Sequence, residues 1–463
     1  MVRLFRVFVP VSVLALLVSE ISLIFACFVA SAYLSLGADP SVFLLYDGGM
    51  TRIALVAGSI VLGLYFHDLY THITVKSRIL LAQQLCQVVG IALLAQGIIS
   101  YADPELIVPR RVMLLGSAMV LVFAIAWRLL YSTFIFRVVG AQRLLLVGGS
   151  PVLGEIAVHI QEHPELGIKV IGQVDDCASA MPIRWGSKVL GPLKAVADIA
   201  QRMRPDRITV GLSERRDRMP VSGLLDLRFA GFRIEEASST YEAVCGRIRT
   251  AELRPAQLIF SGALGPQRST LFVHTVSSLL LALIGVIVVL PLMLLVALAV
   301  KLTSPGPVLY RQTRVGVQGR PFTLFKFRSM RADAEHGTGA VWATRNDPRV
   351  TPIGRVLRKL RLDELPQLIN VLRNEMSVVG PRPERPEFVK ILSEQIPYFR
   401  QRHCIKPGIT GWAQINHPYA DTLEDAIIKL EYDLYYIKNM SLSLDTYIIF
   451  HTLKTMLLSR GSR

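Results

Sequence analysis

The stretch LFVHTVSSLLLALIGVIVVLPLMLLVALAV, Leu271–Val300, is a run of 30 mostly apolar residues that contains Pro291. The run is long enough to cross a hydrocarbon core, but a proline removes an intrahelical hydrogen bond and kinks the helix. Basic residues stand at both ends, with Arg268 before the run and Lys301 and Arg311 after it. A kinked helix that spans the membrane is the commoner structure for an isolated segment of this kind. Flanking charge of one sign instead favours a helix–break–helix that enters the membrane and returns, and the chemistry downstream decides between the two.

Four further apolar segments precede this run, and each is near the length that crosses a bilayer. They are Val7–Leu36, Ile53–Tyr70, Ile79–Ile99 and Val112–Phe136. The first is too long for the apolar part of a signal peptide and lacks a small-residue cleavage site. The basic residues that flank these segments place the N-terminus, and everything after the fourth segment, in the cytoplasm by the positive-inside rule.

Two charged residues, Glu20 and Arg128, fall inside the apolar segments. Ionisable residues within a membrane are functional candidates by default. The alternatives are a structural pair buried between the helices, or an Arg128 side chain that reaches the cytoplasmic edge.

A strand, a glycine turn and an amphipathic helix follow in RLLLVGGSPVLGEIAVHI, Arg143–Ile160, with a second strand in Val170–Cys177. This order begins a βαβ unit, and Ile208–Gly211 and Phe232–Ile234 extend the parallel sheet. Counted from Gly148, a dinucleotide fingerprint has Ser150 and Leu153 where its second and third glycines belong. Because those glycines allow the backbone to approach a pyrophosphate, we predict a structural or regulatory Rossmann-like domain with no cofactor-binding residues.

The chain of 463 residues carries a formal net charge of +16 and is 52% hydrophobic. Such a balance suits a polyanionic partner: nucleic acid, anionic lipid or a phosphorylated substrate. Residues 301–360 contain twelve Lys or Arg and three Asp or Glu, directly after the broken apolar run, and show no nucleic-acid-binding motif. We therefore exclude nucleic acid as a partner. Five scattered cysteines without a CxxC pair predict packing residues in a reducing compartment, with neither a disulfide framework nor a zinc site.

Adjacent carboxylates, Asp363 and Glu364, stand after this basic run in LRLDELPQLINVL, Leu360–Leu372. Thr351 before Pro352 predicts the start of one helix, and a second helix is expected to start at Asp363. Asp363 is then either a helix N-cap, which is the commoner role for a lone Asp, or a nucleophile held ionised among arginines. Glu364 would complement the helix dipole or hold Mg²⁺, which bridges phosphate oxygens. No histidine cluster offers a general base.

Arginines near the pair suit diphosphate recognition, because a planar guanidinium binds two phosphate oxygens at once. Candidate phosphate-binding residues are Lys326, Arg328, Arg358 and Arg382, the last presented between two prolines in a stiff turn. The segment Lys406–Asn416 reads as a close-approach loop or as a turn with a packed Trp412. The helix over 423–437 is either interfacial or core-facing.

Five motifs follow in order behind the broken helix: KFRSMRADAE, LDELPQLINVL, VGPRPERPEF, KPGITGWAQIN and YDLYYIKN. Together they resemble the bacterial sugar transferase family, monotopic polyprenyl-phosphate sugar phosphotransferases that initiate exopolysaccharide and O-antigen synthesis. The resemblance implies transfer of a sugar phosphate from a UDP-sugar to undecaprenyl phosphate, with release of UMP and a need for Mg²⁺. It implies further that Asp363 forms a covalent phosphosugar intermediate, that Glu364 binds the metal, and that Arg382, Lys326 and Arg358 contact phosphate. The family's membrane helix is re-entrant and broken at a Ser-Pro pair, of which Pro291 is present while Leu290 replaces the serine.

We therefore expect a multidomain protein of the bacterial inner membrane. Residues 1–140 would form a four-helix transmembrane region, 141–264 a Rossmann-like α/β domain, and 265–463 a mostly α catalytic domain with a re-entrant helix over about 271–300. The catalytic domain would face the cytoplasm, bind UDP-sugar (glucose by family frequency), undecaprenyl phosphate and anionic lipid, and is compatible with a homodimer. The rivals are a nicotinamide-dependent sugar-nucleotide modifier and a non-enzymatic scaffold for polysaccharide export.

Overall fold

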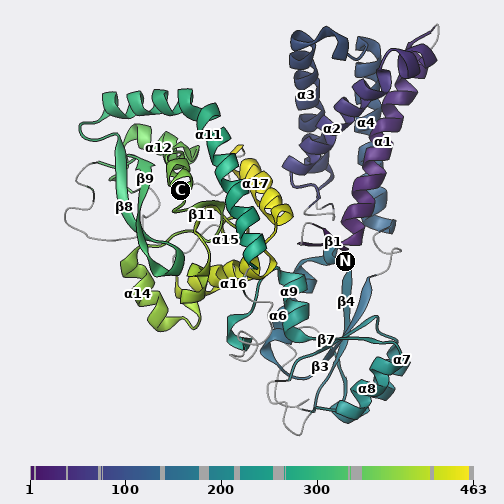
Figure 1. The fold of residues 1–463 in the computed structure, drawn as a ribbon. Helices are drawn as coiled ribbons and strands as arrows, with labels where there is room; N and C mark the ends of the chain where they lie inside the picture. Colours follow the sequence, from purple (N-terminus) through teal and green to yellow (C-terminus); the bar gives the residue numbers. More distant parts are fainter. Residues whose placement is uncertain are drawn as a thin grey trace. The chain divides into compact units, whose positions relative to one another are not determined.

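The computed structural model describes residues 2–4, 7–37, 40–70, 75, 77–135, 141–176, 187–212, 219–253, 265, 267–331, 334, 347–417 and 422–457. The chain divides into two compact units, one of Met1–Arg3 with Phe8–Thr240 and the other of Leu4–Val7 with Tyr241–Arg463. Figure 1 shows their elements, beginning with the short strands β1 (Val2–Leu4) and β2 (Val7–Val9). The predicted domain limits at residues 140 and 264 lie outside the described residues.

Several long apolar helices open the first unit, as predicted. They are α1 (Val11–Ser35), α2 (Gly49–Phe66), α3 (Arg78–Ala102) and α4 (Arg110–Leu130). The first begins directly after Pro10, which lacks the backbone N–H that a helix interior requires. Together with α11 of the second unit, these are the five helices in the described part of the chain that are long and apolar enough to cross a membrane.

The two charges inside these helices form a buried ion pair. Nε of Arg128 lies 2.6 Å from Oε1 of Glu20, and its Nη1 donates to the carbonyl of Leu69 at 2.8 Å. The guanidinium also lies 5.3 Å from the ring centroid of Tyr70, a cation–π distance. Because the charges satisfy each other inside the packed helices, the structure supports the structural pair and not an Arg128 that reaches the membrane edge.

A five-stranded parallel sheet forms the rest of the first unit, with strand order β5-β4-β3-β6-β7. Its strands are β3 (Gln142–Val147), β4 (Ile168–Val174), β5 (Val189–Gly191), β6 (Arg207–Val210) and β7 (Arg233–Glu236). Helices α6 (Pro151–Glu162), α7 (Val196–Met203) and α8 (Val221–Phe229) alternate with the strands, and α9 (Ala237–Cys245) follows β7. The predicted α/β domain with a parallel sheet is confirmed; β5, three residues long, was not predicted.

The turn after β3 shows what the missing glycines change. Gly148 has φ +106°, and a Cβ there would collide with the backbone of Gly211. The side chains of Ser150 and Leu153 are buried, and Leu153 packs where a Cβ on Gly211 would otherwise point. The turn therefore keeps its first glycine for conformation, while buried side chains stand at the second and third glycine positions of the fingerprint.

The second unit is mostly helical around short strands. It contains α11 (Arg268–Thr303), the antiparallel hairpin of β8 (Leu309–Val315) and β9 (Pro321–Phe327), and α12 (Pro352–Lys359). After these come α13 (Gln367–Leu372), the parallel pair β10 (Ser377–Val379) and β11 (Gly408–Thr410), and α14 (Pro386–Gln395). The unit ends with α15 (Trp412–Asn416), α16 (Leu423–Asn439) and α17 (Leu442–Leu457).

The two halves of α11 both pack on this same unit. In the first half Ala282 joins a core with Leu324 of β9 and Val371 of α13. In the second half Val296 and Val300 pack against β9 and α12. Figure 1 shows that the ribbon of α11 changes direction along its length, and Pro291 lies inside the helix. A bend is expected at a proline, which cannot donate to the preceding turn.

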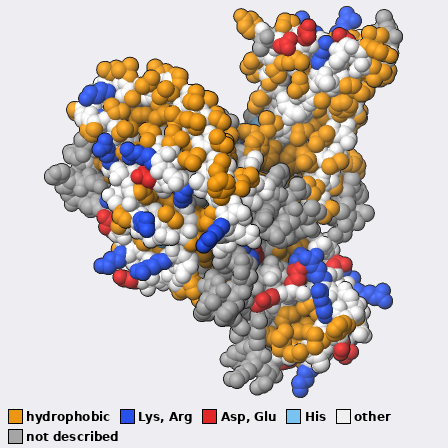
Figure 2. Space-filling view, viewed as in Figure 1, with side chains coloured by type: hydrophobic (Ala, Val, Ile, Leu, Met, Phe, Trp, Pro, Cys, Tyr) orange, Lys and Arg blue, Asp and Glu red, His pale blue; other side chains and the backbone are white. Residues whose placement is uncertain are grey.

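Most of the outer surface of α11 is apolar and exposed (Figure 2). Ile287, Val288 and Leu295 are among its exposed side chains. Exposed apolar area of this extent marks a surface that meets lipid or another apolar partner.

The cysteine prediction is partly wrong. Cys27 is buried and Cys245 is half-buried, but Cys86 and Cys404 are exposed and so are not packing residues. Cys177 lies outside the described residues.

Candidate active site

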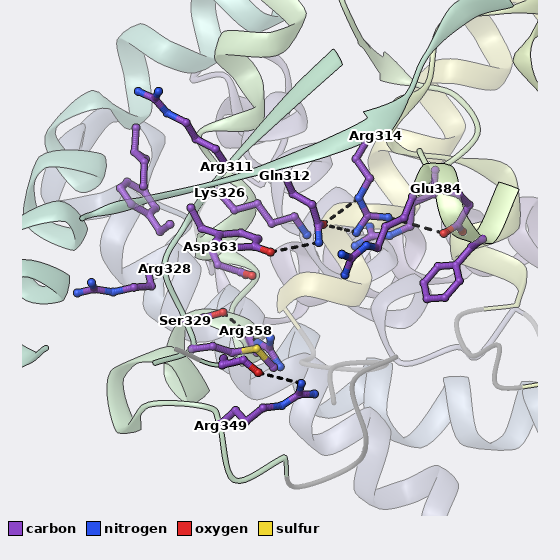
Figure 3. A pocket seen from close by; sticks show the side chains of 18 of the residues that line it. Arg311, Gln312, Arg314, Lys326, Arg328, Ser329, Arg349, Arg358, Asp363 and Glu384 are labelled. Carbon is purple, nitrogen blue, oxygen red and sulfur yellow. Dashed lines mark hydrogen bonds and ion pairs between the residues drawn. The ribbon is translucent and has the colours of Figure 1, made fainter. Parts of the chain in front are cut away.

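A pocket of about 1040 Å³ lies within the second unit, between the β8–β9 hairpin, α12, the loop before α14, and α16 (Figure 3). Two of its lining residues, Asp363 and Glu384, are acidic, and eleven are basic. The basic residues are Arg311, Arg314, Lys326, Arg328, Arg331, Arg349, Arg358, Arg382, Arg385, Arg402 and Lys429. A lining with this excess of positive charge is suited to a polyanionic ligand.

Helix α12 brings the chain to the carboxylate pair, and its start follows the sequence rules. The hydroxyl of Thr351 accepts a hydrogen bond from the N–H of Gly354 at 3.0 Å, with Pro352 in the first turn, as predicted. Gly354 lies so close to Ser329 that an added Cβ would collide with the Ser329 backbone. This contact sets the position of α12 against the end of β9, so that Nε of Arg358 donates to the hydroxyl of Ser329 at 3.1 Å.

The start predicted for the next helix is wrong. Residues Leu362–Glu364 form a single 3₁₀ turn, and α13 begins only at Gln367. Asp363 is therefore not the N-cap of α13. Arg361 precedes the turn in the left-handed region, with φ +54°, a conformation that costs an L-residue free energy and often occurs at functional sites. The left-handed residue and the 3₁₀ turn carry Asp363, whose side chain is buried and lines the pocket.

Glu364 is held by two cations from different elements. Its Oε1 lies 2.7 Å from Nη2 of Arg382 and 3.3 Å from Nζ of Lys326 on β9. Burial alone would raise the pKa of Glu364, but the charges of Arg382 and Lys326 outweigh burial and hold the pKa well below its usual range. Burial in turn lowers the pKa of Lys326, against the attraction of Glu364. The two cations thus favour the ionised form of Glu364 and hold its side chain in place.

Asp363 lies in a different environment from its neighbour. Its side chain is buried, with 8% of its surface exposed, and no salt bridge closer than 4 Å is formed by it in the described part of the chain. Burial, and then the negative charge of Glu364, raise the pKa of Asp363, while Lys326, Arg358 and Arg382 oppose the rise. The sequence-based expectation considered only the basic residues, which do favour the ionised form, and did not include the opposing effects of burial and the adjacent acid.

The turn that carries Arg382 is rigid. The N–H of Gly408 donates to the carbonyl of Pro381 at 2.9 Å, and the N–H of Val315 donates to the carbonyl of Glu384 at 2.9 Å. Between them, Nη1 of Arg314 donates to the carbonyl of Pro383 at 3.0 Å. Because prolines also fix φ on both sides of Arg382, the backbone of this arginine is tightly constrained while its guanidinium reaches Glu364.

Arg328 is in the pocket lining but its donors are engaged elsewhere. Nη1 donates to the carbonyl of Pro305 at 2.8 Å, and Nη2 to the carbonyl and hydroxyl of Ser304 at 2.7 Å. In Figure 3 its side chain extends away from Asp363. Arg328 therefore holds the carbonyl end of α11, a position that a cation stabilises. Lys326, Arg358 and Arg382 remain near the carboxylates, as predicted.

Several pocket residues were not predicted from the sequence. Gln312 and Arg314, two apart on β8, share one face of the hairpin, and Nε of Arg314 donates to Oε1 of Gln312 at 2.9 Å. Lys429 on α16 and Arg349, just before α12, also line the pocket. The glycine-containing turn between two runs of aromatic and β-branched residues would have predicted the hairpin, and with it Arg314.

Two other predicted segments have structural roles. The ring of Trp412 is buried and stacks on Tyr435 with centroids 5.6 Å apart, as the packed-turn alternative predicts. A Cβ on Gly408 or Gly411 would collide with the backbone of Gly380, so the close-approach alternative is also correct. Leu430, Leu434 and Ile437 of α16 are buried, so this helix is core-facing.

The fit of a magnesium ion can be tested on the donors present. No group of three or more His, Cys, Asp or Glu side chains that could hold a metal occurs among the described residues. Mg²⁺ is commonly bound by one or two carboxylates together with substrate phosphates and water. Asp363 and Glu364 offer such oxygens, but Oε1 of Glu364 already faces two cations. The site therefore fits an ion that arrives with a diphosphate better than one bound by protein alone.

Comparisons with known proteins identify relatives over this region. A family model described as bacterial sugar transferase matches residues 269–459. A UDP-glucose:undecaprenyl-phosphate glucose-1-phosphate transferase of Escherichia coli (strain K12) is 34% identical over 317 residues, 67% of each chain. A protein of the same name from Xanthomonas campestris pv. campestris is 36% identical over 334 residues, 68% of this chain and 66% of that protein.

A third relative is named for another sugar. The UDP-N-acetylgalactosamine-undecaprenyl-phosphate N-acetylgalactosaminephosphotransferase of Aeromonas hydrophila is 46% identical over 222 residues. That match covers 48% of this chain and only 52% of the relative, so this chain spans about half the length of that protein.

Proposed function

The chain belongs to the bacterial sugar transferase family, and from this premise we propose that its pocket transfers a sugar 1-phosphate from a UDP-sugar to undecaprenyl phosphate, releasing UMP. The observation that carries the proposal is Asp363 in a pocket lined by eleven basic residues, with the adjacent Glu364 bound to two of them, Arg382 and Lys326. A diphosphate would satisfy these charges, and a buried carboxylate beside them is a nucleophile directed at phosphorus.

The proposed reaction has two displacements at one phosphorus atom. An oxygen of the Asp363 carboxylate attacks the β-phosphorus, the bond from that phosphorus to the bridging oxygen breaks, and UMP leaves with the bridging oxygen. An oxygen of undecaprenyl phosphate then attacks the phosphorus of the aspartyl phosphosugar and releases the Asp363 carboxylate. No general base is required, because the attacking groups of both steps are already anionic.

Each side chain near the phosphates has a separate task in this proposal. Arg382 and Lys326 hold Glu364 at 2.7 and 3.3 Å, and the remaining donors of Arg382 are available to a phosphate. Arg358, fixed through Ser329, supplies charge on the other side of Asp363. Mg²⁺, held by Glu364 and the diphosphate, would screen the repulsion between the anionic nucleophile and its anionic target.

We further propose that α11 is a re-entrant helix and that the second unit lies on the cytoplasmic face of the bacterial inner membrane. A straight helix of 36 residues would be about 54 Å long, so its ends could not both pack on one small unit. Here both halves of α11 pack on the second unit, and the helix contains Pro291. Basic residues beside the apolar surface of α11 would meet anionic lipid headgroups.

The sugar and the pathway are also proposals. The relatives are named for glucose and for N-acetylgalactosamine, so we propose UDP-glucose first and the N-acetylated sugar second. The product would be the first lipid-linked intermediate of exopolysaccharide or O-antigen synthesis, made by a monomer or a homodimer.

The test is transfer by the purified full chain in lipid nanodiscs. Undecaprenyl phosphate, Mg²⁺ and each of a panel of UDP-sugars are supplied, and UMP and lipid-linked sugar phosphate are measured. We expect one UDP-sugar to give both products in equal amounts, with a phosphosugar bound to the protein when lipid is omitted. Asp363→Asn should abolish both products and the adduct. An Asp363→Asn variant with full activity would exclude the proposed nucleophile, and no transfer with any sugar would favour the scaffold alternative.

A further inference from the structure

Four consecutive carbonyls of the turn around Arg382 accept hydrogen bonds, and one of these bonds comes from a buried arginine. The carbonyls of Pro381, Pro383 and Glu384 are bound by neighbouring strands and by Arg314. The carbonyl of Arg382 itself accepts from Nη2 of Arg402 at 3.0 Å. This bond holds the backbone carbonyl of the same residue whose side chain contacts Glu364.

Arg402 is in turn held by a buried acid. Its Nη2 lies 2.8 Å from Oδ2 of Asp433 on α16, and the two side chains are 6% and 2% exposed. The guanidinium carbon also lies 5.2 Å from the ring centroid of Phe399. Asp433 makes no other ion pair among the described residues, so its charge is directed at Arg402. A chain of contacts therefore runs from α16 to the backbone of the turn.

We propose that Asp433 and Arg402 are positioning residues for the transfer reaction. They hold the backbone of Arg382 in place. The Arg382 guanidinium can then position Glu364 and the substrate diphosphate relative to the carboxylate of Asp363. This inference rests on the proposed function. It distinguishes the pair from Glu431, the other fully buried acid of α16, which binds the N–H of Thr250 at 3.0 Å and faces Arg247 and Arg249 away from the pocket.

The surroundings of Asp433 predict how the pair responds to pH. Burial raises the pKa of Asp433 to about 6, Arg402 and Lys429 oppose the rise, and Glu384 adds to it. Asp433 is thus ionised above about pH 6 and neutral below it. As the pH falls through this value, Arg402 loses its counter-charge and the backbone of Arg382 loses its support. Activity should then decline on the acid side.

The experiment compares Asp433→Asn, Asp433→Glu and Arg402→Lys with the control Glu431→Gln, all in the full chain in nanodiscs. UMP release is measured from about pH 5 to about pH 8, and melting temperatures are recorded for each variant. We expect Asp433→Asn to lower kcat/KM roughly 10- to 100-fold at neutral pH, the range seen when partners that orient a site residue are removed. It should also lose the acid limb near pH 6, while Asp433→Glu, which keeps the charge, recovers part of the activity.

The control should lose stability but keep the wild-type kcat/KM and pH profile. If Asp433→Asn melts cooperatively yet has wild-type kinetics and an unchanged acid limb, the proposal is overturned. If that variant does not fold, Arg402→Lys decides: wild-type kinetics in it overturn the proposal, and a lowered kcat/KM without loss of folding supports it. An inactive wild type would instead count against the proposed function, so the two failures are distinguishable.

Discussion

Replacing Arg382 by Ala tests the central contact of the pocket. The substitution removes the 2.7 Å contact to Glu364 and leaves that carboxylate with Lys326 alone, at 3.3 Å. A charge-assisted hydrogen bond contributes about 1.5–3 kcal/mol. We take the lower half of that range, because 37% of the Arg382 side chain is exposed and water would replace part of the interaction. About 1.5 kcal/mol corresponds to roughly a tenfold loss in kcat/KM.

In the proposed reaction, Arg382 also donates a hydrogen bond to the substrate phosphates, and the substitution removes this donor. Removal of one preorganised donor from a developing negative charge costs about 2.7–4 kcal/mol in other enzymes, or roughly 10²- to 10³-fold. The two contributions act through one side chain and are not additive, so we expect Arg382→Ala to lose roughly 10²- to 10³-fold in kcat/KM. Arg382→Lys, which keeps the charge but not the planar fork, should recover part of it.

The assay is initial-rate UMP release at several pH values. Because Arg382 contributes to the depressed pKa of Glu364, its removal should raise that pKa. The residual activity of Arg382→Ala should therefore keep the decline near pH 6 that we assign to Asp433, and should decline further at a lower pH, where Glu364 is now protonated. The exposed Arg400, which lies outside the pocket lining, gives the control Arg400→Ala with expected wild-type rates. If Arg382→Ala kept kcat/KM within about threefold of the wild type at every pH, the assignment of Glu364 and Arg382 to one unit would be refuted.

Three further predictions address the elements that support the site. Gly354→Ala places a Cβ against the Ser329 backbone, so we expect α12 to move, with a lower melting temperature and reduced UMP release; unchanged values for both would show that the contact is dispensable. Pro291→Ala restores an intrahelical hydrogen-bond donor, and a proline in a helix interior costs about 3 kcal/mol, so we expect α11 to straighten. A fraction of the C-termini should then be cleaved by a protease added on the periplasmic side. If all C-termini of the variant stay on the cytoplasmic side, the argument is contradicted. Burial raises the pKa of Asp445 to about 7 from 3.8, so its contribution to stability is full below about pH 4 and is lost as the pH rises to about 7, a change of at most about 4 kcal/mol. Asp445→Asn should therefore flatten the decline of the melting temperature between about pH 4 and about pH 7, and an equally steep decline in the variant would assign it to other groups.

The elements that follow from local rules were predictable. The cap formed by Thr351 before Pro352 needs only residues three apart, and it is present as predicted. The strands β3 and β6 were predicted from short apolar runs, because a strand buried on both faces has no polar alternation. By contrast, β5 has three residues and forms because β4 lies beside it, which no local pattern records.

The start of α13 failed for a different reason. A proline in the first turn is compatible with a helix that begins at Asp363, so the local rule was satisfied. The chain instead takes a left-handed residue at Arg361 and a 3₁₀ turn. The cost of that conformation is offset by tertiary contacts, with Arg382 and Lys326 on Glu364. Contacts between residues far apart in the sequence therefore decided the local structure.

The types of residue in the site could be predicted, but not their partners. Asp363, Glu364 and Arg382 stand out in the sequence because of charge and proline context. Arg328 was equally basic, yet it binds the end of α11, since the hairpin aims it at Ser304. Asp433 stands in the YDLYYIKN motif, but the sequence assigned it no role, because its buried partner Arg402 is far from it along the chain.

The two adjacent carboxylates lie in different environments. This difference favours Asp363 as the nucleophile and Glu364 as the electrostatic anchor over the reverse assignment. If Glu364 were the nucleophile, it would have to leave two cations at 2.7 and 3.3 Å, and the contact with Arg382 alone contributes about 1.5 kcal/mol. Asp363 forms no salt bridge with any other described residue, and its raised pKa reflects a carboxylate that is poorly solvated and hence reactive once ionised. When environments push the pKa values of two neighbouring acids apart, the acids take different roles. This difference supports the proposed roles, in which Glu364 is the electrostatic anchor and Asp363 supplies the reacting oxygen.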